Sequence, residues 1–169
     1  MAERISLRDY QRDLAARLRA ADTSRMSSKL AVQAGADGWL VDLMESGEVI
    51  PVPPITSVAQ TRPWFKGVAN VRGNLYSVVD FPAFLGGKGV AVGEQSRLLL
   101  VAPRYRAGAA LLVDASLGLR NPESWQPRET AQAPAAWQRA EYEDEAGRVW
   151  KELDVAELVR DQNFLTVGS

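Results

Sequence analysis

The sequence predicts an all-β protein with a helix at each end. Short apolar runs with the two-residue period of β-strands begin after Ser28, and turn residues separate them at the spacing of a small β domain. No pattern for a helix of 10 to 15 residues alternates with these runs, so a parallel α/β sheet is not expected. A glycine-rich connector at 86–93 divides the strands into two groups.

Ten strands are expected in all, five on each side of this connector. The first five are 29–33, 38–43, 48–52, 67–72 and 75–80, and the second five are 97–102, 109–113, 117–119, 137–143 and 148–153. Each group alone is too small to bury much apolar surface, so we expect two lobes that pack together as one cooperative domain. The Pro-rich, Gln-rich and Glu-rich stretch 121–134 is expected to be an irregular loop.

Helices are expected at both ends of the chain and after the first group of strands. An apolar stripe at helical spacing predicts a helix over 7–21, formed by Leu7, Tyr10, Leu14, Leu18 and Ala21. We expect this stripe to dock on the domain that follows, although a free helix that binds a partner is the alternative. Pro82 suits the first turn of a short helix that ends at Gly86, and Asp154 suits the cap of a helix over 155–160. Residues 1–27 are thus an amphipathic leader, and 28–169 are the domain.

The composition argues against catalysis and against a cofactor. The 169 residues include no His and no Cys, which removes the usual proton-transfer group at neutral pH and the softest metal ligand. Asp80, Asp114, Glu141 and Glu143 are the remaining acid and base candidates, but Asp80 and Asp114 each end an apolar run and are better interpreted as strand ends. The connector is no phosphate loop, because Gly89 follows Lys88 where Ser or Thr is needed.

The charge and the absence of targeting signals argue against nucleic-acid binding, export and membrane insertion. The net charge is −1, and residues 31–138 carry nine basic and nine acidic side chains, so a nucleic-acid-binding barrel is only a minor alternative despite five Trp residues. The N-terminus lacks the apolar run of a signal peptide, and no apolar run approaches the ~20 residues of a membrane span. We therefore expect a cytoplasmic protein that does not insert into a membrane.

One hairpin carries the most informative polar residues. A two-residue turn at Gly73 and Asn74 would pair Arg72 with Leu75 and Val71 with Tyr76. Alternation then places an apolar set on one face of the hairpin, namely Ala69, Val71, Tyr76 and Val78. Asn70, Arg72 and Ser77 lie on the opposite face. An ordinary half-buried hairpin with solvated polar residues would show the same pattern.

The segment 66–73, KGVANVRG, followed by VVDF at 78–81, resembles the signature of the chemotaxis coupling proteins, the CheW-like domain family. Weaker similarity extends over about 28–160. The resemblance implies two five-stranded SH3-like barrels packed on a shared core. It also implies a non-enzymatic adapter that links the signalling tip of a methyl-accepting chemotaxis receptor to the regulatory domain of a CheA-like histidine kinase. Ser77 and Pro82 depart from the family pattern, which carries Pro and Arg there.

The resemblance also supplies candidate contact residues. Glu48 precedes Arg72 by 24 residues, at the spacing where the family carries a Glu that pairs with the signature Arg. An exposed ion pair important only for solubility is the alternative interpretation. The residues expected to contact partners are Glu48, Val49, Ile50, Asn70, Arg72 and Gly73, with Trp64 and Lys66 nearby.

The long N-terminal helix and the lack of a further module resemble the PilI-type couplers of pilus-associated, chemotaxis-like pathways. This implies recruitment to membrane receptor arrays and control of type IV pilus twitching motility. A coupler of flagellar chemotaxis remains the alternative.

Overall fold

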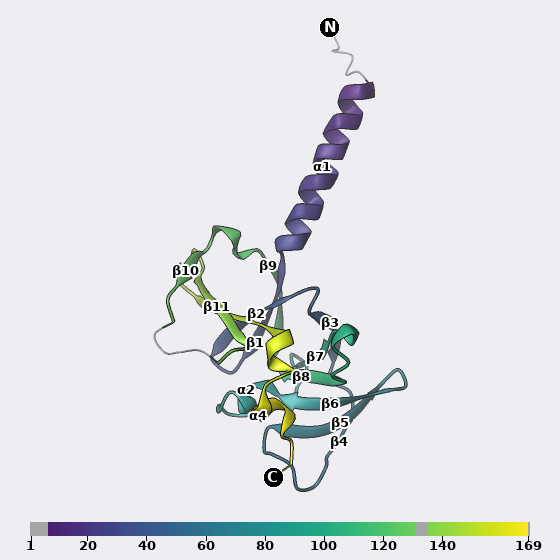
Figure 1. Ribbon diagram of the computed structural model, residues 1–169, viewed down its shortest axis with the longest axis vertical. Helices are drawn as coiled ribbons and strands as arrows, with labels where there is room; N and C mark the ends of the chain where they lie inside the picture. Colours follow the sequence, from purple (N-terminus) through teal and green to yellow (C-terminus); the bar gives the residue numbers. More distant parts are fainter. Residues whose placement is uncertain (1–6, 131–134, 169) are drawn as a thin grey trace.

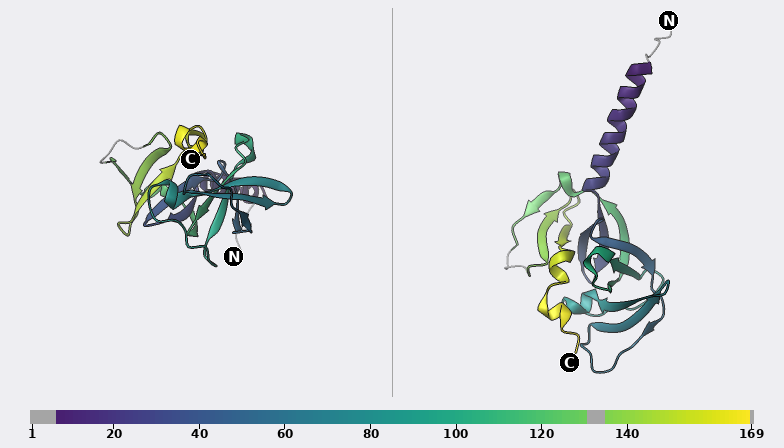
Figure 2. Two further views of the ribbon diagram at one scale, coloured as in Figure 1. Left: turned by 90° about the horizontal axis from the view of Figure 1, so that it is seen from below. Right: turned by 45° about the vertical axis from the view of Figure 1, so that its right-hand side comes forward.

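The computed structural model describes residues 7–130 and 135–168, which form two curved β-sheets with a long helix projecting from one end (Figure 1). Each sheet has six strands. Views from other directions show the strongly twisted strands curling into two adjoining barrels, with the C-terminal helices along one side (Figure 2).

The first sheet contains the first two strands of the domain and its last four. Its strand order is β10-β11-β12-β2-β1-β9, antiparallel except for the parallel pair β12 and β2. The strand bounds are Lys29–Ala34 (β1), Asp37–Asp42 (β2), Ala115–Arg120 (β9), Gln126–Arg128 (β10), Gln138–Glu143 (β11) and Val149–Leu153 (β12).

The second sheet is built from the middle of the chain. Its strand order is β3-β7-β8-β6-β5-β4, with one parallel pair, β6 and β8. The strand bounds are Ser46–Pro51 (β3), Ile55–Thr56 (β4), Phe65–Val71 (β5), Asn74–Asp80 (β6), Arg97–Val101 (β7) and Ala109–Val113 (β8).

The all-β class with two barrel-like lobes is confirmed, but the expected assignment of strands to lobes is wrong. The connector at 86–93 does not separate the lobes, because β1 and β2 pair with C-terminal strands while β7 and β8 join the middle strands. Two short edge strands were also not expected. β4 follows a Pro-Pro break, and β10 lies inside the stretch 121–134, of which residues 131–134 lie outside the described part. Apolar periodicity locates strands but does not determine which strands pair.

The lobes share one apolar core. Both sheets contribute to it, with Val32, Trp39 and Val41 from the first sheet packed with Leu99 and other residues of the second. Trp39 is central, since its ring meets Phe81 edge to face at 5.2 Å. Its exposed fraction is 1%. Burial of large apolar side chains across both sheets makes the lobes one cooperative unit.

The N-terminal helix α1 (Leu7–Ser27) is longer than expected and does not dock on the barrels. It extends away from them in Figure 1 and in the right-hand view of Figure 2, and its apolar stripe is open to solvent at Tyr10, Leu14 and Leu18, which are 58%, 45% and 59% exposed. The expected docking is therefore wrong. Residues 1–6 and the side chains of Leu7 and Ala21 lie outside the described part.

Three short helices complete the fold. α2 (Phe81–Phe84) and α3 (Val155–Leu158) confirm the two short helices expected from sequence, and the Asp154 carboxylate caps α3 by accepting a hydrogen bond from the N–H of Glu157 at 3.0 Å. α4 (Gln162–Leu165) was not expected. Two 3-10 turns are also present, at Pro103–Tyr105 and Pro122–Ser124. In the part of the chain that the structure describes, no helix has the length and apolar character of a membrane span.

Candidate functional site

The tip of the β5–β6 hairpin differs from the sequence expectation by one residue. The turn is formed by Arg72 and Gly73, with Val71 paired to Asn74, whereas the sequence analysis placed Gly73 and Asn74 in the turn. Both central residues have positive φ, 52° for Arg72 and 86° for Gly73, as the commonest two-residue hairpin turn requires. The predicted pairing of Arg72 with Leu75 is therefore wrong.

Local hydrogen bonding favours the observed turn. The side-chain oxygen of Asn70 accepts a hydrogen bond from the N–H of Gly73 at 2.9 Å, and this closes the turn. A left-handed conformation costs a non-glycine residue roughly 1 to 2 kcal/mol, so Arg72 holds a strained position that the surrounding contacts offset. Strained residues of this kind concentrate at functional sites.

The faces of the hairpin nevertheless match the expectation. Moving the turn by one residue changes the partner of each residue by two positions along the opposite strand. Because side chains alternate with a period of two, each side chain stays on the same face. Ala69 pairs with Tyr76, and both point toward the core, where Val71 and Val78 are buried. Asn70 and Leu75, which also pair, are exposed on the other face.

The expected ion pair is formed at this tip. The Arg72 Nη2 atom lies 2.5 Å from the Glu48 Oε1 atom on β3, and the two side chains are 68% and 46% exposed. The hydrogen bond from Arg72 lowers the pKa of Glu48 below its ordinary value, and the same bond raises the pKa of Arg72. Three strands separate β3 from β5 in the sheet order, so curling of the sheet brings the pair together.

A groove of about 340 Å³ lies beside this ion pair. Glu48 and Arg72 line it together with apolar and aromatic groups from β5, β6 and β7. The additional lining residues are Gly47, Val71, Asn74, Tyr76, Leu100, Val101 and Pro103. Leu100 and Val101 were not predicted as contacts, because β7 lies far from the signature segment in the chain and reaches the groove only through sheet pairing.

The other candidates divide into two groups. Val49 and Ile50 are half-buried and pack against the apolar clusters, so they position β3. Trp64 and Lys66 lie at the start of β5, at the opposite end of the hairpin from Arg72. The seven residues of β5 span roughly 23 Å, so the structure separates these two side chains from the ion pair.

Lys66 instead contacts a buried carboxylate that organises the region after the hairpin. Its Nζ lies 3.2 Å from the Oδ2 of Asp80, whose side chain is 0% exposed. The Asp80 side chain caps α2 by accepting a hydrogen bond from the N–H of Ala83. It also accepts a hydrogen bond from the N–H of Val90. Val90 is buried, so this part of the glycine-rich connector is packed against the fold.

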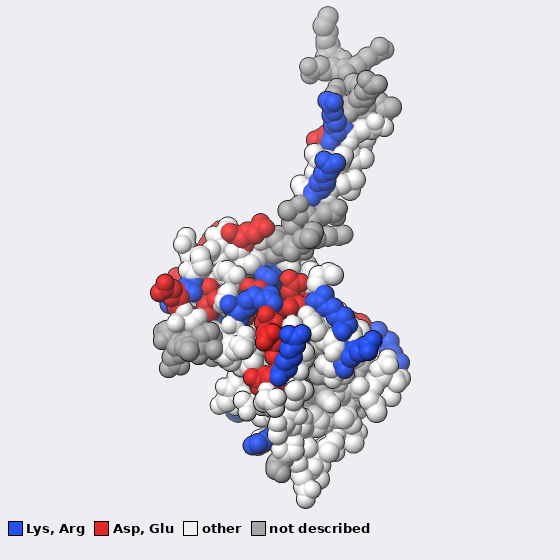
Figure 3. Space-filling view, viewed as in Figure 1, with Lys and Arg blue, Asp and Glu red and all other residues white. Residues whose placement is uncertain are grey.

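Charges of both signs are interleaved over the middle of the molecule, with no extended basic surface on the face shown in Figure 3. Among the described residues, no group of three or more carboxylates is arranged to hold a metal ion. The geometry at the hairpin tip therefore offers an exposed, oriented guanidinium beside a groove with both polar and apolar lining, which suits recognition of a protein surface.

Comparisons with known proteins agree with this fold. The chain is 33% identical over 94 residues to Protein PilI of Pseudomonas aeruginosa, a match that covers 56% of this chain and 52% of that protein. The chain thus aligns with about half the length of this curated relative. The crystal structure of the scaffolding protein TtCheW from Thermoanaerobacter tengcongensis superimposes with a TM-score of 0.62 at 18% identity, over 76% of this chain and 88% of that one. The CheW-like domain model matches residues 29–163, and the chain belongs to this family.

Proposed function

We propose that this protein is a non-enzymatic adapter that couples a methyl-accepting chemotaxis receptor to a CheA-like histidine kinase in a pathway that controls type IV pilus twitching motility. The observation that carries the proposal is the Arg72 guanidinium, presented on a strained turn and held by Glu48 beside the groove. An Arg that is exposed and held in one orientation beside a groove is typical of residues that dominate the energy of a protein interface.

Family membership and the similarity to PilI support the adapter role and the choice of pathway. An adapter transmits a receptor state only if its partners have different affinities for the two states of the complex. A small contact area, of about 1,200 Å² or less, fits such a reversible assembly.

The test uses the full chain with a receptor signalling-tip fragment and with the regulatory domain of the pathway's kinase. We expect co-sedimentation with both, and we expect Arg72→Ala and Glu48→Ala to weaken at least one association about tenfold or more. The melting temperature should hardly change, because the pair is exposed.

Arg128→Ala is the matched control, because it removes a similarly exposed ion pair, with Glu143 at 3.5 Å, on the other sheet. Normal binding by both tip variants would show that the hairpin tip is not the contact surface. A regulatory domain from a flagellar pathway, offered in competition, distinguishes the flagellar alternative, which predicts preference for that domain.

A further inference from the structure

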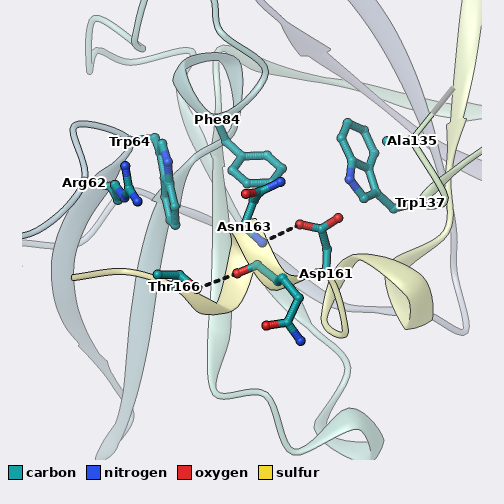
Figure 4. A pocket seen from close by; sticks show the side chains of 9 residues that line it. Arg62, Trp64, Phe84, Ala135, Trp137, Asp161, Asn163 and Thr166 are labelled. Carbon is teal, nitrogen blue, oxygen red and sulfur yellow. Dashed lines mark hydrogen bonds between the residues drawn. The ribbon is translucent and has the colours of Figure 1, made fainter. Parts of the chain in front are cut away.

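A second candidate site lies at the other end of the β5–β6 hairpin. It is a cleft of about 430 Å³ whose aromatic walls are Trp64, Phe84 and Trp137 (Figure 4). These side chains come from three segments, the entry to β5, the helix α2 and the entry to β11, and the cleft is also lined by Asn163 on α4 and by Thr166 just after it.

The walls of this cleft are fixed by packing. The ring of Phe84 meets those of Trp64, Trp137 and Phe164 at centroid distances of 5.3, 5.8 and 5.6 Å. The backbone N–H of Arg62 donates to the carbonyl oxygen of Val167 at 2.8 Å, which ties the C-terminal segment to the chain before β5. A preformed wall lowers the entropic cost of binding a partner.

The two ends of the cleft carry opposite charges. Figure 4 shows Arg62 beside Trp64 at one end and Asp161 near Trp137 at the other, with Phe84 between them. Within the described part of the chain the Arg62 guanidinium forms no ion pair. The Asp161 Oδ1 atom caps α4 by accepting from the N–H groups of Asn163 and Phe164 at 2.8 and 3.1 Å, while its Oδ2 atom receives no hydrogen bond from the residues described.

The composition of the cleft favours a peptide over a small metabolite. Its rim is exposed at Arg62, Gln162, Asn163 and Thr166, so a ligand would remain open to solvent on one side. Sites for small molecules enclose most of their ligand, whereas Trp and Arg at an open surface are the side chains enriched at protein interfaces. The volume accommodates one large side chain and its neighbours.

We propose that this cleft binds an extended segment of a partner protein in which a large apolar side chain lies between an acidic and a basic residue. The apolar side chain would pack over Phe84, flanked by Trp64 and Trp137, with the acidic residue at Arg62 and the basic residue at Asp161. Because β5 separates the cleft from the hairpin tip, this site would engage its partner without occupying the surface proposed for coupling.

The test is selection from a displayed library of random short peptides against the full chain, followed by affinity measurement for the enriched peptides. We expect enrichment of an acidic, a large apolar and a basic residue in that order or its reverse. Arg62→Glu should weaken these peptides about tenfold or more and, in a repeated selection, replace the acidic preference by a basic one. A purely structural role for Arg62 would not reverse a preference.

Asp161→Asn tests the other end without removing the helix cap, because an Asn oxygen caps as well as Asp. It should remove the preference for the basic residue only. Arg128→Glu on β10 is the charge-reversal control and should leave affinity unchanged. Absence of enriched peptides, or enriched peptides whose affinity is unaffected by Arg62→Glu, would overturn the proposal while leaving the hairpin-tip function untouched.

Discussion

Arg72 has both an unfavourable backbone conformation and a side chain held in place by an ion pair. Its backbone is left-handed with φ of 52°, and its guanidinium is held in one orientation by Glu48 on another strand. A glycine at this position would remove the backbone strain and the guanidinium together. The presence of Arg in a position that favours glycine is consistent with a side chain kept for binding.

We predict that Arg72→Gly is more stable than Arg72→Ala by about 1 kcal/mol. Both variants lack the guanidinium, so their difference isolates the backbone conformation, and both should lose partner binding equally. Urea denaturation measures the stability difference, and co-sedimentation measures binding. Equal stability of the two variants would show that the turn relaxes to another conformation without Arg.

At the scale of the β5–β6 hairpin, Gly67 has a different role from the turn residue Gly73. Gly67 has φ of 129° and lies at a register shift in the β5–β6 pairing. A Cβ atom added there would lie 2.0 Å from the carbonyl oxygen of Thr56 on β4, whereas one added to Gly73 would meet nothing within 4 Å. Gly67 thus permits the close approach of the edge strand, while Gly73 serves only the turn.

We therefore expect Gly67→Ala to destabilise the protein by at least about 2 kcal/mol more than Gly73→Ala. Both substitutions place a side chain at positive φ, but the φ of Gly67 lies farther from the left-handed region, and only there does the side chain also clash with the backbone of β4. Thermal or urea unfolding of the two variants measures it. Similar stabilities would contradict the close packing of β4 on β5.

At the scale of the whole molecule, a charge network connects strands of the first sheet to the segment that leads into the second sheet. Arg139 on β11 contacts three carboxylates, those of Asp154 at 2.7 Å, Glu45 at 3.2 Å and Glu152 at 3.3 Å. Glu45 precedes β3 and is buried, so the network reaches the point where the chain crosses from one sheet to the other. Lys29 adds a second cation, 3.0 Å from Glu152.

Electrostatics within this network favours the charged forms. Burial alone lowers the pKa of Arg139, but hydrogen bonds and charge interactions with Asp154 and Glu45 outweigh it and raise the pKa. Burial likewise raises the pKa of Asp154, yet hydrogen bonds from the N–H of Glu157 and from Arg139 lower it overall. A carboxyl group with a lowered pKa stabilises the fold above its ordinary value of 3.8, and this contribution is lost as the pH falls through the folded value.

Arg139→Met should destabilise the protein by about 2 kcal/mol at pH 7, less than for a fully buried pair because the Arg139 side chain is 42% exposed. The deficit should begin to shrink at pH 3, below the ordinary value of 3.8, where the wild type starts to lose the contribution of Asp154. Urea denaturation at the two pH values measures this. Arg160→Met, which removes the exposed pair with Glu157, is the control and should cost less than about 1 kcal/mol at either pH. A deficit independent of pH would assign the effect to packing.

Much of the secondary structure followed from the sequence, because alternation and turn residues are local properties. The ten expected strands, the first turn of α2 at Pro82 and the cap of α3 at Asp154 all depend on residues within a few positions of one another. The pairing of Glu48 with Arg72 was reached differently, from the resemblance of the signature segment and a fixed spacing. The predicted register of the turn was wrong because Asn70 closes a turn in which Arg72 has positive φ, a conformation that is unfavourable for residues other than glycine.

The sequence by itself determined the all-β class and the faces of the signature hairpin, while the ion pair at its tip was expected only from the family resemblance. Only the tertiary structure decided which strands share a sheet, that α1 extends from the barrels, and that Trp64 lines a cleft far from Arg72. The physical reason is the separation along the chain of the residues that interact. Side-chain alternation acts between neighbours in the chain, whereas strand partners and clefts arise from contacts between segments that the sequence separates by up to a hundred residues or more, such as β2 and β12.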